Sequence, residues 1–278
     1  MSGTLYLVAT PIGNLSDISE RALKTLNEVD FIAAEDTRVT IKLLNRYNIS
    51  KQLVSYYEHN KKDSGEKIVS RLLSGESCAL VTDAGMPAIS DPGEDLVKLC
   101  AAENICVSVI PGPCAAVSAL SVSGLTTGRF CFEGFLSTSK KSRFSHLEEL
   151  KTEHRTMIFY EAPHKLIKTL ADMLSVWGDR AVSISREMTK IHEETLRGSL
   201  SEMLAHFEST PPKGEFVLVI EGAERTEDEP ISLDDALALT ESYIQSGMSI
   251  KDAAKKCSEE TGVSKNAIYK SIIKGNLL

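Results

Sequence analysis

Apolar runs alternate with amphipathic segments along roughly the first 120 residues. Strands are predicted at 4–10, 31–35, 53–57, 78–84 and 105–111. Helices are predicted between and after them, at 17–29, 38–47, 64–74, 92–103 and 114–123. This alternation is typical of a largely parallel sheet covered by helices. The strand runs are apolar at nearly every position, as expected where both faces of a sheet are buried.

A second α/β segment follows a break at 123–129. Its predicted strands are 129–136, 155–162, 181–187, 194–200 and 215–222, and its predicted helices are 140–151, 163–177 and 200–208. These strands alternate more between apolar and polar positions, which favours a mixed sheet with one less buried face. The polar stretch 222–230 then reads as a linker.

The remaining residues predict three short helices, at 232–246, 249–260 and 264–274. The last two, with Gly262 in the turn and Ser264 as a cap, form a helix-turn-helix pattern. Its second helix carries polar residues on one face and isoleucines expected to point inward, namely Asn266, Lys270 and Lys274 against Ile268, Ile272 and Ile273. With Lys265 this face is a candidate nucleic-acid surface; the alternative is a small packed bundle. The domains are therefore predicted at 1–123, 124–224 and 225–278.

Composition and charge limit the class of protein. The net charge of −8 argues weakly against a nucleic-acid partner, but the average hides local differences. One Arg stands against seven acids in 223–241, whereas six Lys stand against three acids in 251–278. No apolar run is long enough to span a membrane, and the first ten residues lack signal-peptide features. Six Cys without CxxC spacing are expected as free thiols in the cytoplasm, with no metal site.

The stretch 82–93, TDAGMPAISDPG, follows the fourth strand and has unusually strong control of backbone shape. Gly85 permits a positive φ or close approach of a ligand. Asp91, Pro92 and Glu94 resemble a helix cap with its first residue and capping partner. Asp83 has no such structural explanation, so it is predicted to bind a ligand at this edge of the sheet.

Similar loops follow the other strands. Their distinctive residues include Pro11 after the first strand, Glu35, Asp36 and Arg38 after the second, His59 after the third, and Gly112 after the fifth. Five such strand ends together predict a cleft. The sequence has no GxGxxG, GxxxxGK[ST], HExxH or GxSxG motif, which weakens or excludes dinucleotide, P-loop, zinc-protease and hydrolase interpretations.

Seven motifs, in order from residue 4 to about 222, resemble the bacterial ribosomal RNA small-subunit methyltransferase I family of the tetrapyrrole methylase superfamily. They are TLYLVATPIGNLSDIS, AAEDTR, TDAGMPAISDPG, IPGPCAA, YEAPHK, SREMTKIHEE and GEFVLVIEG. The resemblance implies two α/β domains with a cleft between them and a C-terminal helical extension. It also implies S-adenosylmethionine (SAM) as cofactor, and 2′-O-methylation of a cytidine in the decoding region of 16S rRNA.

The same resemblance implies which residues surround the cofactor. Pro11, Asp83 and Met86 would lie near it in the first domain, with backbone contacts from Cys114 and Ala115. The second domain would contribute residues around the adenine, namely Tyr160, Met188, Gly214, Glu215 and Phe216. The superfamily also implies a homodimer, while naked 16S rRNA and the small ribosomal subunit both stay open as the substrate.

A ribose hydroxyl is a poor nucleophile until it loses its proton, so a general base is expected. Charged residues of the strand-end loops are all candidates, with His59, Glu35 and Glu187 foremost, and Asp36, Glu161, His164 and Lys190 also open. Arg38, Arg186 and Lys190 suit RNA phosphates, together with Lys265 and Lys270 in the tail; the first three could equally form salt bridges between loops.

Two other functions are compatible with parts of this pattern. One is a SAM-dependent methyltransferase for a small tetrapyrrole precursor, which would share the fold but has no need of the tail. The other is a metabolite-sensing regulator that reads DNA with the tail; charge clusters at several strand ends speak against a simple sensor.

Overall fold

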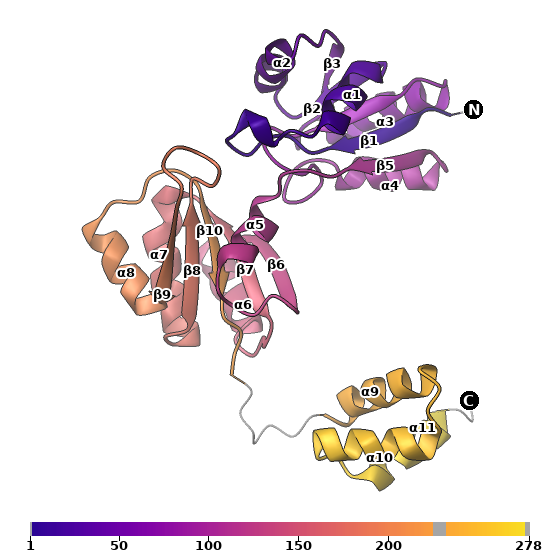
Figure 1. Cartoon of the computed structure of the whole chain (residues 1–278), viewed down its shortest axis with the longest axis vertical. Coiled ribbons are helices and arrows are strands. Elements are labelled where there is room, and N and C mark those ends of the chain that lie inside the picture. The colour runs from indigo at the N-terminus through magenta and orange to yellow at the C-terminus, as the bar shows by residue number, and fades with distance from the viewer. Residues whose placement is uncertain (1, 225–231, 276–278) are drawn as a thin grey trace. The chain divides into compact units, whose positions relative to one another are not determined.

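The computed structural model describes residues 2–224 and 232–275 (Figure 1). The chain forms two compact units, Met1–Ala223 and Glu224–Leu278. In the described residues no helix is both long and apolar enough to cross a membrane.

The first sheet contains five parallel strands in the order β3-β2-β4-β1-β5. They are β1 (Thr4–Val8), β2 (Phe31–Ala34), β3 (Gln52–Ser55), β4 (Cys78–Val81) and β5 (Cys106–Ile110). Every residue of β2 and β4 is buried, in agreement with their continuous apolar sequences. The predicted parallel sheet is confirmed, and the carboxyl ends of all five strands meet at one edge.

Four helices cover this sheet. Apolar residues of α1 (Glu20–Glu28) and α2 (Thr37–Arg46) pack on one face, and those of α3 (Lys61–Leu73) and α4 (Glu94–Ala102) on the other. A short 3₁₀ turn, η1 (Leu15–Asp17), precedes α1. The prediction that Asp91 caps α4 is wrong, because the helix begins at Glu94 with Gly93 as N-cap. Gly93 has φ of 149°, and a Cβ there would lie 2.9 Å from side-chain atoms of Ala88 and Leu80.

The second sheet is mixed, as predicted, with the order β6-β7-β10-β8-β9. Its strands are β6 (Phe130–Phe135), β7 (Thr156–Glu161), β8 (Ala181–Arg186), β9 (Glu194–Ser199) and β10 (Phe216–Ile220). β6 and β7 are parallel, and the other three pairings are antiparallel. One face is covered by α6 (Lys140–Glu149), α7 (Pro163–Trp177) and α8 (Leu200–Ser209), which form the largest apolar core.

The other face of the second sheet is covered by α5 (Ala115–Val122). Ala116, Ala119 and Leu120 of this helix pack with Ile158 and Val219 of the sheet. Helix α5 precedes the boundary predicted at residue 123, so the N-terminal segment supplies a layer of the second sheet. Small side chains allow this helix to lie close to the strands.

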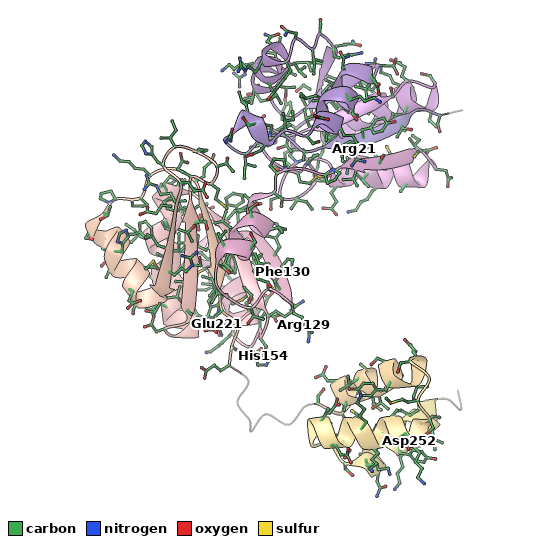
Figure 2. The ribbon with its side chains drawn as sticks, viewed as in Figure 1. Arg21, Arg129, Phe130, His154, Glu221 and Asp252 are labelled. Carbon is green, nitrogen blue, oxygen red and sulfur yellow. The ribbon has the colours of Figure 1, made fainter. Side chains whose placement is uncertain are left out.

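The far end of the second sheet is where β6 begins and β10 ends; Figure 2 labels Arg129, Phe130, His154 and Glu221 there. His154 Nδ1 lies 3.0 Å from the carbonyl oxygen of Ala223. This contact fixes the last residue of the first unit to the loop before β7.

The C-terminal unit contains α9 (Leu233–Gln245), α10 (Ile250–Thr261) and α11 (Lys265–Gly275). Gly262 ends α10 in the left-handed conformation, with φ of 71°. Ser249 caps the start of α10 by accepting a hydrogen bond from the N–H of Asp252, which Figure 2 labels. The three predicted helices and the turn are confirmed.

The C-terminal core is small and apolar. Ile268 and Ile272 are buried in it with residues of α9 and α10, but Ile273 is 38% exposed, so its predicted inward position is wrong. Tyr269 and Lys270 are exposed, and Lys265 is half-buried. The side chain of Lys274, predicted on the same face, lies outside the described residues.

We expect Ala119→Leu to lower the free energy of unfolding of the first unit by about 1–3 kcal/mol, because Ala119 is fully buried and added methyl groups overpack a filled space. Val117→Leu on the same helix is the matched control, since Val117 is 53% exposed and should change stability by less than about 0.5 kcal/mol. Urea unfolding of both variants measures the difference. Equal stability of the two variants would contradict close packing of α5 on the sheet.

Candidate functional site

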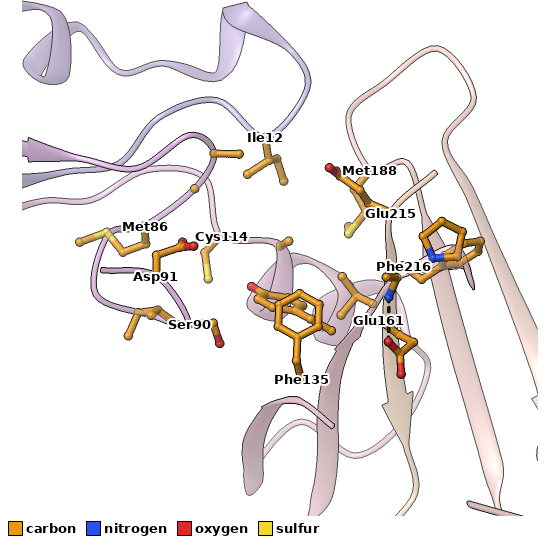
Figure 3. A pocket seen from close by; sticks show the side chains of 18 residues that line it. Ile12, Met86, Ser90, Asp91, Cys114, Phe135, Glu161, Met188, Glu215 and Phe216 are labelled. Carbon is orange, nitrogen blue, oxygen red and sulfur yellow. Dashed lines mark hydrogen bonds between the residues drawn. The ribbon is translucent and has the colours of Figure 1, made fainter. Parts of the chain in front are cut away.

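A cavity of about 320 Å³ lies in the first unit, between loops at the carboxyl edge of the first sheet and one end of the second (Figure 3). The loops after β1 and β4 and the start of α5 contribute Ile12, Ala84, Gly85, Met86, Ile89, Ser90, Asp91, Cys114 and Ala115 to its lining. The second sheet and its loops contribute Phe135, Tyr160, Glu161, Ala162, Pro163, Met188, Glu215, Phe216 and Val217. The cleft predicted between two α/β segments thus has a defined volume and lining.

The loop 82–93 forms one wall, and its backbone is held in an unusual shape. Gly85 has φ of 89°, and Ala88 and Ser90 also have positive φ, at 69° and 61°. Positive φ is uncommon for residues with a Cβ, and such strain collects at ligand sites. Figure 3 shows Ser90, Asp91 and Cys114 around the space opposite the second sheet. The strong backbone control seen in the sequence therefore shapes a cavity wall.

The opposite wall is largely aromatic and apolar. The hydroxyl oxygen of Tyr160 accepts a hydrogen bond from the N–H of Ala116 at 3.2 Å, which connects β7 to the start of α5. Burial raises the pKa of Tyr160 to about 12, so the phenol stays protonated at neutral pH. The Phe135 ring lies 5.5 Å from the Tyr160 ring, and Met188 and Phe216 complete this wall.

Three acidic side chains line the cavity, and their environments differ. Glu215 forms an ion pair with Lys190 at 2.9 Å. Burial, and next the negative charge of Glu35, raise the pKa of Asp91 to about 6. Glu161 is almost fully buried, accepts a hydrogen bond from Thr169 and forms an ion pair with Lys165 at 2.9 Å. Asp91 is therefore the carboxylate best suited to meet a cationic ligand, whereas Glu161 is already neutralised by the protein.

These properties fit SAM, and we call this space of about 320 Å³ the cofactor cavity. Its sulfonium and ammonium groups are cationic and match the Asp91 carboxylate, which carries no ion pair among the described residues. Its adenine would contact apolar and aromatic side chains such as Met188 and Phe216. Seven of the residues predicted around the cofactor line this cavity, namely Met86, Cys114, Ala115, Tyr160, Met188, Glu215 and Phe216.

Three other residues predicted around the cofactor lie elsewhere. Pro11 and Asp83 line a second cavity beside α2, and Gly214 lines neither cavity. Gly214 has φ of 92°, and a Cβ there would lie 2.5 Å from Glu187 Cγ. A glycine is therefore required at position 214 because the side chain of Glu187 occupies the space that a Cβ would need.

The base candidates fall in different surroundings. The carboxylate of Glu187 binds Lys190 at 2.9 Å, and this contact holds the pKa of Glu187 below its ordinary value. A proton acceptor with a lowered pKa is a weak base, which disfavours Glu187. Glu35 lies at the edge of the first sheet, where its Oε2 is 3.5 Å from the N–H of Asp83. His59 is exposed in the loop after β3.

The cations predicted to bind RNA in the first unit all have protein partners. Arg38 pairs with Asp36 at 2.6 Å and is otherwise exposed, and this pairing lowers the pKa of Asp36 to about 2. Arg186 donates to the carbonyl of Lys213 and pairs with Glu194 at 3.2 Å. Lys190 bridges Glu187 and Glu215. Of these pairs, Lys190–Glu215 joins two loops, as the salt-bridge alternative predicts. Arg38 instead pairs with the cap residue of its own helix, and Arg186 pairs with the neighbouring strand β9.

The loop after β1 approaches the loop after β8 very closely. A Cβ at Gly13 would lie 2.5 Å from Lys190 Cγ and 2.8 Å from Thr189 Oγ1. Glycine at this position therefore lets the two loops meet beside the cofactor cavity.

Ile12, Ser90, Asp91, Phe135 and Glu161 line the cavity although sequence reasoning did not assign them to the cofactor. For Asp91 the signal was present in the motif but was interpreted as a helix cap. No motif singles out Phe135, whose position depends on how β6 pairs with β7. In the part of the chain that the structure describes, no group of His, Cys, Asp and Glu could hold a metal ion.

Residues 4–204 match the family described as "Tetrapyrrole (Corrin/Porphyrin) Methylases". The chain belongs to this family, and it is therefore a methyltransferase whose cofactor is SAM, as the sequence predicts. The two α/β sheets and the cavity between them agree with this assignment.

Several curated proteins named "Ribosomal RNA small subunit methyltransferase I" are similar to the chain. The protein from Halalkalibacterium halodurans is 51% identical over 96% of this chain and 93% of its own length. The protein from Bacillus subtilis is 46% identical over 96% and 93%, respectively. The protein from Thermotoga maritima is 51% identical over 80% of this chain and all of its own length.

Solved structures with the same fold are more distant in sequence. A crystal structure of diphthine synthase has a TM-score of 0.60 at 13% identity and covers 79% of this chain and 90% of its own. Uroporphyrin-III C-methyl transferase from Thermus thermophilus, complexed with S-adenyl homocysteine, has a TM-score of 0.55 at 15% identity, covering 78% and 97%. These likenesses establish the fold.

We expect the affinity for SAM to rise up to about tenfold between pH 5 and pH 7, because Asp91, with its raised pKa of about 6, is mostly neutral at the lower pH and ionised at the higher. Asp91→Asn should bind more weakly at pH 7 and lose most of this dependence. Calorimetry across the pH range measures both effects.

Asp83→Asn is the matched control, since Asp83 does not line the cofactor cavity and its replacement should leave the SAM affinity close to that of the wild type. Weaker binding by Asp83→Asn, with Asp91→Asn unchanged, would contradict this assignment and favour the role that the resemblance gives Asp83.

Proposed function

We propose that this protein transfers a methyl group from SAM to the ribose 2′-hydroxyl of a cytidine in the decoding region of 16S rRNA. The observation that carries the proposal is similarity, over 96% of the chain, to proteins named for methylation of small-subunit ribosomal RNA. That similarity includes most of the C-terminal helices, which lie beyond the matched family region. The place of action would be the cytoplasm.

The reaction needs an oxygen nucleophile held in line with the donor methyl group, at roughly 3 Å from its carbon. SAM supplies an activated methyl group on a positively charged sulfur. The protein would hold that charge beside Asp91 and enclose the donor between the loop 82–93 and the aromatic wall. Excluding water from this cavity would favour transfer to the ordered ribose hydroxyl.

A base near the acceptor would remove the hydroxyl proton. Of the predicted bases, Glu35 lies at the edge of the first sheet, where its carboxylate accepts a hydrogen bond from the N–H of Asp83, whereas Glu187 forms an ion pair with Lys190. His59 has an exposed ring with no ion-pair partner among the described residues. Glu35 and His59 are therefore the better base candidates.

RNA binding would draw on both units. Arg38 is the most exposed of the predicted cations in the first unit. Because Arg38 already pairs with Asp36, an RNA phosphate would bind the same guanidinium group in addition to that carboxylate. Arg186 and Lys190 are held in loop contacts and would contribute less. Lys265 and Lys270 of α11 would supply a separate contact with RNA phosphates. Such local positive charge would offset the repulsion between RNA and a protein of net charge −8.

We expect purified protein, labelled SAM and small ribosomal subunits lacking the modification to yield labelled 2′-O-methylcytidine. Nuclease digestion followed by mass spectrometry identifies the nucleoside, and naked 16S rRNA tested in parallel decides which form is the substrate. Asp91→Asn should lower the rate at a SAM concentration below its wild-type Kd. Binding of SAM without transfer to either RNA would contradict the proposal and direct the search to small tetrapyrrole acceptors.

We also propose that the protein is a homodimer, which would join two RNA-binding surfaces and partly offset the acidic average. Small-angle scattering at working concentration should then give a mass near twice the 30.4 kDa of one chain. A mass of one chain across the concentration range would rule this arrangement out.

A further inference from the structure

A second cavity, of about 260 Å³, lies between α2 and the loops that follow β1 and β4. We call it the α2 cavity, and its lining residues are Thr10, Pro11, Leu15, Val39, Thr40, Lys42, Leu43, Arg46, Thr82 and Asp83. None of them lines the cofactor cavity. The cavity therefore needs an explanation other than binding of the methyl donor.

The two cavities share the same pair of loops. Thr10 and Gly85 form a backbone bridge, with hydrogen bonds of 2.9 and 3.1 Å in the two directions. Thr10 lines the α2 cavity and Gly85 the cofactor cavity, so the bridge lies between them. The buried hydroxyl of Thr10 also donates to the carbonyl of Thr82 at 3.1 Å, which fixes the wall on this side.

The lining of the α2 cavity combines apolar and cationic side chains. Val39 and Leu43 are one helical turn apart, and so are Lys42 and Arg46, which places all four on neighbouring positions of α2. Leu15 adds a further apolar contact and is held by the hydroxyl of Tyr47, which donates to its carbonyl at 2.6 Å. Apolar contact suits a nucleobase, and cations beside it suit its phosphates.

Lys42 and Arg46 differ from the other cations near the strand ends. Both are exposed, and neither has a salt-bridge partner within residues 2–224 and 232–275. Arg38, Arg186 and Lys190 all have carboxylate partners. Two unpaired cations at the rim of a cavity in an acidic protein are the expected arrangement for binding an anion.

Asp83 supplies a hydrogen-bond acceptor at the same place. Its Oδ1 accepts from the N–H of Asp36 at 3.2 Å, which fixes the carboxylate at the sheet edge. Burial raises the pKa of Asp83, and the nearby negative charge of Asp36 acts in the same direction. A carboxylate in this position can accept a hydrogen bond from a ribose hydroxyl.

We propose that the α2 cavity holds a nucleotide of the RNA substrate next to the cofactor cavity. Val39 and Leu43 contact the base, Lys42 and Arg46 bind the flanking phosphates, and Asp83 receives a ribose hydroxyl. This role rests on the proposed RNA methylation, and in it the α2 cavity recognises the RNA strand that accepts the methyl group.

The first test removes the two cations. Lys42→Ala/Arg46→Ala should raise the KM for RNA about tenfold and flatten the dependence of log affinity on log salt by about 1.4, or roughly 0.7 for each lost phosphate contact with single-stranded RNA. The probe is a 16S rRNA fragment that contains the decoding region. Lys24→Ala/Lys67→Ala removes the same charge from exposed positions of α1 and α3 and should leave both values near those of the wild type.

The second test fills the cavity. Val39→Trp should lower kcat/KM for RNA at least tenfold while leaving the SAM affinity unchanged, because the indole would occupy the space of the base. Ile41→Trp is the matched control on the same helix, since Ile41 is 49% exposed and does not line the cavity. Val39 is itself 38% exposed, so either variant should fold, and calorimetric binding of SAM verifies this.

The outcomes separate the two proposals. Wild-type protein that methylates the RNA, with both test variants behaving like their controls, would overturn the nucleotide site but keep the proposed function. Wild-type protein that binds SAM and methylates neither this fragment nor the small ribosomal subunit would overturn both. If Val39→Trp fails to bind SAM, the comparison of Lys42→Ala/Arg46→Ala with its control decides alone, since Lys42 and Arg46 are exposed and lie outside the core.

Discussion

The close packing of α5 on the second sheet is the contact on which the arrangement of the first unit depends. Ala116 and Ala119 bring the helix near the strands, and the N–H of Ala116 donates to Tyr160. The helix begins directly after β5 and its loop, so this contact fixes the carboxyl edge of the first sheet against the second. The cofactor cavity is a consequence of that attachment.

The loop 82–93 holds a strained backbone conformation that shapes the walls of both cavities. Ala88 and Ser90 adopt positive φ, at a cost of order 1–3 kcal/mol for each strained residue. The bridge between Thr10 and Gly85 stabilises this conformation at one end, and glycine at position 93 leaves the space that Ala88 and Leu80 occupy at the other. The loop can therefore present Asp91 to one cavity and Asp83 to the other, although the two are only eight positions apart.

The sequence predicted the strands and helices closely because each has a simple cause. Continuous apolar runs gave β2 and β4, the alternation in the second segment indicated a mixed sheet, and Gly262 marked the end of α10. The side chains of the site were harder. Asp91 fitted a helix-cap pattern, and only the actual start of α4 at Glu94 shows that it does not cap. The motifs could place Asp83 near the strand end but could not tell which of two adjoining cavities it faces.

The place of α5 could not be read from the sequence either. A helix following a strand is expected to cover its own sheet, and nothing in the alanine-rich segment 115–122 specifies a different partner. The ion pair of Lys190 with Glu215 likewise joins residues 25 positions apart, and it depends on the antiparallel pairing of β8 and β10.

The contact at Gly13 has a consequence for which substitutions the junction can accept. The methylene groups of Lys190 and the hydroxyl of Thr189 already fill the space where a side chain at position 13 would begin. Position 13 is therefore limited by volume, since even one methyl group would separate the loops. Position 190, by contrast, is limited by both the length of its aliphatic chain and its charge, because the same lysine fills the gap and forms ion pairs with two glutamates.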